Sequence, residues 1–262
     1  METTVRLGSF LGVFVVLAIW EWLSPRRTLT VSKGLRWFGN LSITVINPVL
    51  LRLIIPILPV QLAITAGERG WGILNYQIGL PYWARVVIGV VVLDCVIYLQ
   101  HVIFHRLPLL WRLHSMHHTD MDLDVTSGLR FHPIEILLSM GIKLAAVILI
   151  GAPALAVLIF EVLLNATSMF EHANAYIPPG LDRVLRLLIV TPDMHRVHHS
   201  VIRSENDSNF GFNLSVWDRL FRTYLAKPSE GQMGMTIGLP RFQDVRYLNL
   251  LRMLYHPFMR SK

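Results

Sequence analysis

The sequence predicts an all-α fold, a polytopic membrane helical bundle of about three spans plus a helical hairpin, with a cytoplasmic histidine-rich helical cap. Hydrophobic residues make up 53% of the 262 residues and charged residues only 16%, far from the balance of a soluble globular protein. Several apolar runs approach the roughly 20 residues that a helix needs to cross a hydrocarbon core about 30 Å thick. The histidines gather in short clusters outside those runs.

The first two predicted spans lie near the N-terminus. The run from Leu7 to Leu23 has no small-residue cleavage pattern after it, so we expect a retained span and not a signal peptide. The second span, roughly residues 41–66, is interrupted by three prolines and carries Arg52 near its middle. We expect a kinked helix in which Arg52 faces protein or snorkels to the interface.

The remaining spans surround the histidines. Residues 83–99 form a valine- and isoleucine-rich run that leads directly into His101. Residues 134–168 are too many for one span and are broken at 151–153 by Gly-Ala-Pro, which predicts a helical hairpin. Lys143 within this hairpin is expected to snorkel. Residues 181–189 alternate with helical spacing between apolar and charged side chains, which predicts an interfacial amphipathic helix.

The charge pattern predicts the topology. The loop between the first two spans carries an excess of Lys and Arg, so it should be cytoplasmic. Counting spans from there places every histidine cluster on the same cytoplasmic face, and the short chain favours a bacterial inner membrane. The net charge of +7 is scattered and forms no basic stripe with interleaved aromatics, so we expect an anionic membrane surface and no nucleic acid as partner.

The histidine spacing is the strongest chemical signal in the chain. Histidines three or four residues apart share one face of a helix and can reach one ion. Two H-x-x-H-H strings occur, each expected by chance only roughly 0.02 times with 11 histidines in the chain, together with one H-x-x-x-H. In each H-x-x-H-H string, one pair suits one ion while the adjacent ring turns toward a second. The members of the three clusters are His101, His105, His114, His117, His118, His195, His198 and His199.

Three further histidines lie outside the clusters. His172 follows the predicted hairpin on the same face, so we predict that it is a metal ligand. His132 lies at the opening of the hairpin, and three roles remain open for it. It could be a metal ligand, a hydrogen-bond donor that supports a ligand, or a residue that only begins the helix. His256, near the basic C-terminus, is expected to be solvated.

The ligand types restrict the metal. Imidazole suits zinc, copper, iron and nickel, and the absence of an H-E-x-x-H string excludes that class of zinc protease. The single Cys95 can form neither an intramolecular disulfide nor a thiolate zinc site. Eight or nine imidazoles suit two ions. Four carboxylates lie near the clusters in sequence and could fix the imidazole tautomers by accepting a hydrogen bond. A role in structural charge pairs is an equally good interpretation of each. They are Asp94, Asp120, Glu171 and Asp193.

The ordered motifs resemble those of the fatty acid hydroxylase/sterol desaturase superfamily, most of all its bacterial sterol desaturase-like members. They extend over about residues 85–225: Asp94-x-x-x-Tyr98-x-x-His101-x-x-x-His105, His114-Ser-Met-His117-His118, Arg130-Phe-His132-Pro133-Ile-Glu135, His172, His195-Arg-Val-His198-His199, Asn209-Phe-Gly211 and Trp217-Asp218-Arg-Leu-Phe221. One departure is Arg222, where the family pattern usually has glycine, which affects local packing more than chemistry.

The resemblance implies residues 1–82 as N-terminal spans, 83–225 as a fatty acid hydroxylase-like catalytic domain and 226–262 as a C-terminal tail. It implies nine histidine ligands, the eight of the clusters plus His172, holding two iron ions, with zinc as a substitute in purified protein. We add Asp94, Tyr98, His132 and Asp193 as candidate catalytic residues. The expected activity is O2-dependent hydroxylation or desaturation of a lipid C–H bond, with electrons from a separate reductase, ferredoxin or cytochrome b5-like donor.

Two other classes remain open on the sequence. A metal transporter would carry polar or acidic residues through its spans, whereas the histidines here cluster outside them. A catalytically silent lipid-binding or metal-handling membrane protein would keep the fold without needing a full ligand set. The spacing cannot identify the lipid, because pocket shape decides it.

Overall fold

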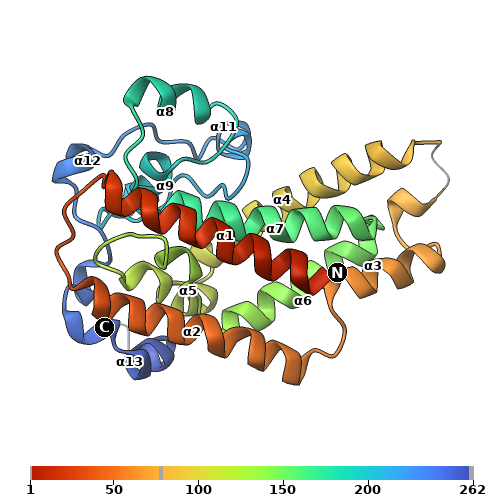
Figure 1. The fold of residues 1–262 in the computed structure, drawn as a ribbon, viewed down its shortest axis with the longest axis horizontal. Coiled ribbons are helices and arrows are strands. Elements are labelled where there is room, and N and C mark those ends of the chain that lie inside the picture. Colours follow the sequence, from red (N-terminus) through yellow and green to blue (C-terminus); the bar gives the residue numbers. More distant parts are fainter. Residues whose placement is uncertain (1, 77–78, 260–262) are drawn as a thin grey trace.

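The structure is a computed structural model that describes residues 2–76 and 79–259. Within this part, regular structure is helical, and strand pairing is limited to isolated bridges. The long helices form a bundle with its axis horizontal in Figure 1: α1 (Glu2–Leu23), α2 (Lys33–Ile54), α3 (Pro59–Glu68), α4 (Tyr82–Arg106), α6 (Pro133–Ile150) and α7 (Ala154–His172).

Short helices build the cap at one end of this bundle. The α-helices are α5 (Pro108–His114), α8 (Pro179–Leu185), α9 (Pro192–His198), α10 (Arg203–Asn206), α11 (Val216–Leu220), α12 (Gly231–Gly234) and α13 (Leu250–Tyr255). The 3-10 helices of the cap are η2 (His117–Thr119), η3 (Ser127–Leu129), η4 (Pro240–Phe242), η5 (Val245–Leu248) and η6 (His256–Phe258). Another 3-10 helix, η1 (Ile73–Asn75), packs against α6 next to Gly151, at the opposite end of the bundle.

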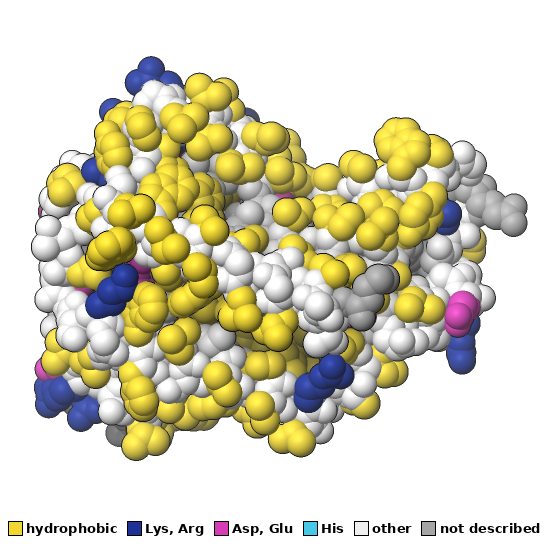
Figure 2. Space-filling view, viewed as in Figure 1, with side chains coloured by type: hydrophobic (Ala, Val, Ile, Leu, Met, Phe, Trp, Pro, Cys, Tyr) yellow, Lys and Arg dark blue, Asp and Glu magenta, His cyan; other side chains and the backbone are white. Residues whose placement is uncertain are grey.

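Five helical segments in the described residues are long and apolar enough to cross a membrane. They are α1, the α2–α3 segment Lys33–Glu68, α4, α6 and α7, which confirms three predicted spans plus a hairpin. On the face drawn in Figure 2, hydrophobic side chains extend along the bundle, and charged side chains are sparse between its ends. A water-soluble protein would not expose so much contiguous apolar surface.

The helix of the second span continues past its first proline before it is interrupted. Pro48 lies inside the continuous helix α2, and the chain leaves the helix only at Ile55, whose extended conformation precedes Pro56. A residue before proline is sterically pushed out of the α region, and Pro59 then begins α3. Arg52 is exposed on α2, which fits the predicted snorkelling and not contact with protein.

The predicted hairpin is confirmed, and its turn depends on Gly151. This residue caps α6 in the left-handed region at φ 69°, and Pro153 precedes the first turn of α7. Glycine adopts that conformation without the steric cost that a Cβ imposes. The hairpin packs on α4 through a core that includes Leu93, Val147 and Phe160. It returns the chain to the end of the bundle where α4 also ends (Figure 1).

The prediction that Lys143 snorkels is wrong. Its side chain is buried, and Nζ donates to Oε1 of Glu161 on α7 at 2.9 Å. Arg6 of α1 also pairs with Glu161. A buried carboxylate needs such compensation, and the three charges connect α1 to the hairpin inside the bundle.

Helix α8 presents its apolar side outward, as an interfacial helix requires. Leu181 and Val184 are exposed, whereas Asp182 and Arg186 are buried as an ion pair on the protein side. Asp182 also accepts a hydrogen bond from Thr191 at the start of α9. The charged face therefore fixes the helix to the cap and leaves leucines for the membrane interface.

His256 is not solvated, contrary to expectation. It is 6% exposed, and its Nε2 lies 2.8 Å from Oγ of Ser115, next to the second histidine cluster. The C-terminal helix α13 folds back onto α2, where Met253 packs with Ile43 and Met116. The prediction was wrong because the basic composition of this segment does not show which helices it packs against.

Candidate metal centre

Four parts of the chain bring nine histidines together at the cap end of the bundle. The last two turns of α4 carry His101 and His105, and α7 ends at His172. Helix α5 with η2 carries the second cluster, and α9 with the residue after it carries the third. All nine side chains are at most 3% exposed. Pro108 and Pro192 begin α5 and α9, since proline is favourable in a first helical turn.

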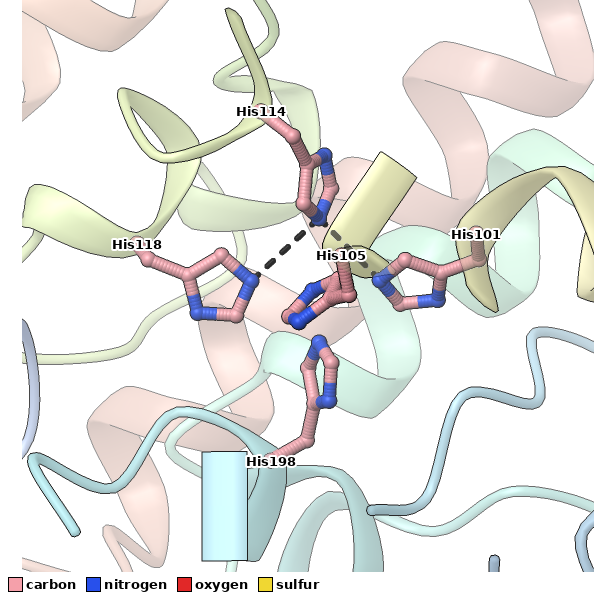
Figure 3. Close-up of side chains that lie close together, drawn as sticks. All are labelled: His101, His105, His114, His118 and His198. Carbon is pink, nitrogen blue, oxygen red and sulfur yellow. Dashed lines mark hydrogen bonds between the residues drawn. The ribbon is translucent and has the colours of Figure 1, made fainter. Parts of the chain in front are cut away.

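The nine histidines form two groups whose potential ligand atoms lie within 4.8 Å of one another inside each group. The five-histidine group (Figure 3) contains His101, His105, His114, His118 and His198. The four-histidine group contains His117, His172, His195 and His199. Each i,i+4 pair stays in one group, whereas His117 and His198 belong to the other group. The spacing predicted that one ring of each H-x-x-H-H string would turn toward a second ion, but not which ring.

In the five-histidine group, the Nδ1 atoms contact the surrounding protein. His101 Nδ1 lies 2.8 Å from the carbonyl oxygen of Phe210, and His198 Nδ1 lies 2.7 Å from that of Ser208. His114 Nδ1 lies 2.6 Å from Oε1 of Glu135. Since these acceptors carry no proton, each Nδ1 must donate, and each Nε2 of these neutral rings is left with a lone pair.

A fourth ring of this group, His118, contacts a side-chain amide. Nδ2 of Asn206 donates to Nδ1 of His118 at 3.0 Å, while Oδ1 of Asn206 has no hydrogen-bond partner among the described residues. The same Nδ2 donates to the carbonyl oxygen of His198 at 2.8 Å. One amide nitrogen of Asn206 thus contacts the second and the third histidine cluster.

The four-histidine group follows the same rule. His117 Nδ1 donates to the carbonyl oxygen of Arg130 at 3.2 Å, and His172 Nδ1 donates to that of Ser168 at 2.7 Å. Beside them, the fully buried Glu171 has no hydrogen-bond partner in the part of the chain that the structure describes, and its carboxylate oxygens lie 3.7 Å from Nδ1 of His172 and of His195. A carboxylate here compensates positive charge in the group.

The geometry fits a cation in each group. The Nε2 atoms of His117 and His172 are 3.0 Å apart, and those of His101 and His114 are 3.1 Å apart. In neutral rings that donate through Nδ1, these are two lone pairs that face each other and cannot share a proton. Two ligands that bind one ion at about 2.1 Å lie roughly 3 Å apart. Nε2 of His198 is also buried and has no hydrogen-bond partner within residues 2–76 and 79–259.

Burial keeps the rings outside the spans in the neutral form that metals bind. Loss of hydration, followed by repulsion from neighbouring imidazoles, lowers the pKa of His117, His118 and His199 well below the usual value. The same causes lower the pKa of His198 to about 3. A charged imidazole has no lone pair to offer, so these rings are ready for ligation at pH values where an exposed histidine would be protonated.

The comparisons with known proteins agree with this geometry. The sequence profile of the family described as "Fatty acid hydroxylase" matches residues 86–223, more than half of the chain. The chain belongs to the fatty acid hydroxylase family. The matched segment contains both histidine groups in full, and family membership confirms the resemblance drawn from the motifs.

Characterised relatives of this fatty acid hydroxylase family chain are longer proteins. Ornithine lipid hydroxylase OlsE of Rhizobium tropici is 32% identical over 158 residues, which is 60% of this chain and 47% of OlsE. Human alkylglycerol monooxygenase is 28% identical over 179 residues, covering 66% of this chain and 38% of that protein. The chain thus aligns with less than half the length of either. No solved structure matches.

Four candidate catalytic residues lie outside both histidine groups. Asp94 accepts hydrogen bonds from Asn213, Leu214 and Trp217, and the hydroxyl of Tyr98 lies 2.8 Å from that of Thr223. Both connect α4 to the segment before and after α11, whose Phe210 carbonyl holds His101. Their catalytic role stays a prediction, and their contacts are those of positioning residues.

His132 and Asp193 make similar structural contacts. His132 Nδ1 accepts from the backbone N–H of Ile134 at the start of α6, while Nε2 donates to the carbonyl oxygen of Leu254. Of the three roles left open for His132, these contacts fit a helix-start residue. Asp193 pairs with Arg26 and Arg196 in front of the third cluster.

Sequence reasoning named Asp120 as a carboxylate near the second histidine cluster, but missed its partner Arg36. The guanidinium of the fully buried Arg36 donates to Asp120 at 2.7 Å and to Asp124 at 2.5 Å. Burial favours the neutral acid, but Arg36 overcomes it and lowers the pKa of Asp120 to about 2. Arg130, also buried, donates to Thr119 and Asn40. Charged residues in an otherwise apolar chain were the available signal.

Proposed function

We propose that this protein is a membrane-bound di-iron oxygenase that hydroxylates or desaturates a C–H bond of a membrane lipid, using O2 and electrons from a separate donor. The observation that carries the proposal is the pair of buried histidine groups, in which Nε2 lone pairs face each other at 3.0 and 3.1 Å. The five-histidine group would hold one ion and the four-histidine group the other.

Two bound iron ions would supply the activation of O2 and the removal of hydrogen from the lipid. The chain's own contribution is to hold each imidazole in one orientation. Backbone carbonyls fix Nδ1 of His101, His117, His172 and His198, and Glu135 fixes His114. Such partners set the tautomer and the basicity of a ligand.

Aromatic side chains exclude water on the membrane side of the centre. Phe131 stacks on the ring of His117 at 4.5 Å between centroids, and Phe212 lies 5.1 Å from the ring of His101. Phe212 belongs to the apolar core between α4, α6 and α7, and Phe131 packs against that core. A hydrocarbon chain approaching from the bilayer between α4 and α6 would meet apolar side chains, apart from the hydrogen-bonded pair Gln100 and Ser139 that joins the two helices.

A groove on the bundle supports a lipid substrate. It has a volume of about 360 Å³ between α4 and α6, and its lining is apolar throughout: Val92, Val96, Ile142, Ala145, Ala146, Leu149 and Ile150. Both helices continue from it toward the cap, α4 to His101 and α6 back to Glu135. We propose that the acyl or alkyl chain of the lipid lies along this seam.

The names of the relatives favour a polar lipid. One is an ornithine lipid hydroxylase and the other an alkylglycerol monooxygenase. We therefore propose hydroxylation of a membrane lipid that carries a polar headgroup, ahead of a sterol or a free alkane. The histidine groups would lie at the cytoplasmic boundary of the membrane, where such a headgroup resides.

Comparative lipid analysis tests the activity. Bacterial cells expressing the protein, supplied with iron and O2, should contain a lipid that has gained one oxygen atom or lost two hydrogens. His198→Ala should abolish the product. His256→Gln, which lies outside both histidine groups, is the matched control and should retain it. If no lipid differs between expressing and non-expressing cells, the oxygenase assignment fails and the silent lipid-binding alternative gains support.

A further inference from the structure

One edge of the five-histidine group lies directly beneath the protein surface. The half-buried ring of Trp111 is 4.7 Å from the ring of His105 and 5.3 Å from that of His118, measured between centroids. The guanidinium of Arg203 stands over the Trp111 ring at 5.3 Å, and the Arg203 side chain is 60% exposed. Trp111 thus connects solvent-exposed charge with two members of the group, both labelled in Figure 3.

A second contact reaches the same point. Nδ1 of His105 lies 3.4 Å from Oδ1 of Asp207, whose side chain is 28% exposed and accepts from Nε of Arg203 at 2.6 Å. The side chains that contact Nδ1 of the other rings in this group are buried among the described residues: Glu135 contacts His114, and Asn206 contacts His118. His105 is therefore the histidine of this group whose side-chain partner is partly exposed to solvent.

The surface around these contacts is basic with an apolar centre. We define the Trp111 patch as the half-buried Trp111 and its exposed neighbours in the chain and in space: Arg106, Leu107, Leu109, Arg112 and Arg203. Leu109 is 73% exposed. Arginine and aromatic residues are enriched where proteins bind one another, and a positive rim steers a negative partner into place.

We propose that the Trp111 patch binds an acidic one-electron carrier protein and that electrons enter the metal centre through Trp111 and His105. This inference rests on the proposed oxygenase function. Hydroxylation consumes one C–H bond, O2, two electrons and two protons, and yields an alcohol and one water. Two successive encounters with the reduced carrier supply the two electrons, and each carrier leaves oxidised by one.

Reduction kinetics test the proposal on the full chain, loaded with iron and placed in phosphatidylcholine nanodiscs. The probe is a reduced, acidic [2Fe–2S] ferredoxin, and dithionite serves as a small reductant that needs no docking surface. Arg203→Glu should lower the second-order rate with ferredoxin at low salt by about tenfold or more. Dithionite should still reduce the centre of that variant at the rate of the unmodified protein.

Arg246→Glu is the matched control, because Arg246 is also an exposed arginine paired with an aspartate, at 66% exposure and 2.8 Å. It should leave both rates unchanged. A second readout needs no iron: the affinity of metal-free protein for oxidised ferredoxin should fall by about tenfold or more in Arg203→Glu and not in Arg246→Glu.

Several results would overturn the proposal. They are equal effects of the two variants, an equal loss of the dithionite rate in Arg203→Glu, or failure of ferredoxin to reduce a centre that dithionite reduces. An effect seen only in nanodiscs containing phosphatidylglycerol would identify the Trp111 patch as a contact for anionic lipid instead. If the chain binds no reducible iron at all, the proposed function itself fails, which distinguishes the two outcomes.

Discussion

At the scale of single residues, the structure explains the one departure from the family motifs. Arg222 stands where the family usually has glycine, and its backbone adopts the left-handed region at φ 60°. That region costs a residue with a Cβ roughly 1–2 kcal/mol. The glycine preference at this position therefore reflects backbone conformation, and the arginine retains the turn at an energetic cost.

Replacing Arg222 should consequently stabilise the protein. Arg222→Gly is expected to increase the free energy of unfolding by about 0.5–1 kcal/mol, seen as a higher midpoint of thermal unfolding in detergent. Arg183→Gly is the matched control, since Arg183 is an exposed arginine inside helix α8. There, glycine should destabilise by about 1 kcal/mol. Equal shifts in the same direction would refute the conformational explanation.

His256 predicts a dependence of stability on pH. Burial, together with Arg130 and other nearby cationic groups, lowers its pKa to about 3 in the folded protein, against about 6.5 in the unfolded chain. Below pH 6.5 His256 binds a proton in the unfolded chain but stays neutral in the folded protein. The free energy of unfolding therefore decreases as the pH falls from 6.5 toward 3.

His256→Gln keeps an amide donor for Ser115 but does not titrate. Between pH 7.5 and 5, this variant should lose about 2 kcal/mol less stability than the unmodified protein. Thermal unfolding at a series of pH values measures the difference. Curves that remain parallel over the whole range would show that His256 is not the buried neutral group described above.

At the scale of elements, the loop from 115 to 130 depends on a helix remote in sequence. Arg36 of α2 pairs with Asp120 and Asp124 in the interior, and all three side chains have no exposed surface. Removing one partner of a buried ion pair typically costs about 3–5 kcal/mol, because the remaining charges lose their compensation. The second histidine cluster begins this loop, so its placement depends on α2.

Arg36→Met should therefore lower stability by about 3–5 kcal/mol and also reduce the metal content of the purified protein. Arg246→Met, which breaks the exposed pair with Asp244, should cost less than about 1 kcal/mol. Thermal unfolding and metal analysis of both variants provide the comparison. A mild effect of Arg36→Met, close to that of Arg246→Met, would mean that α2 does not position the cluster.

Elements differ in how far the sequence could predict them. Spans and the hairpin follow from long apolar runs and from the Gly-Ala-Pro break, because burial in a bilayer imposes length and composition directly. The ion pair of Lys143 with Glu161 could not be foreseen, since snorkelling and pairing leave the same sequence pattern. The sequence could not predict where the second span breaks, because any of its three prolines could have ended the helix. The structure shows that the break lies at Ile55.

At the scale of the whole molecule, local spacing predicted that each H-x-x-H-H string divides between two ions, but left open which pair stays together. The structure keeps His114 with His118 and places His117 in the other group. The partners that orient the rings are distant in sequence, as Glu135 on α6 and Phe210 after α9 illustrate. Such contacts arise only when the bundle assembles, so single-sequence reasoning had no access to them.

Metal analysis of the full chain, purified after iron-replete expression, tests whether the two histidine groups hold two metal ions. We expect two irons per chain with a spectroscopic signature of magnetic coupling. His117→Ala, in the four-histidine group, and His198→Ala, in the five-histidine group, should each lower the metal content. Fewer than two metals per chain in the unmodified protein, or unchanged binding in both variants, would contradict it.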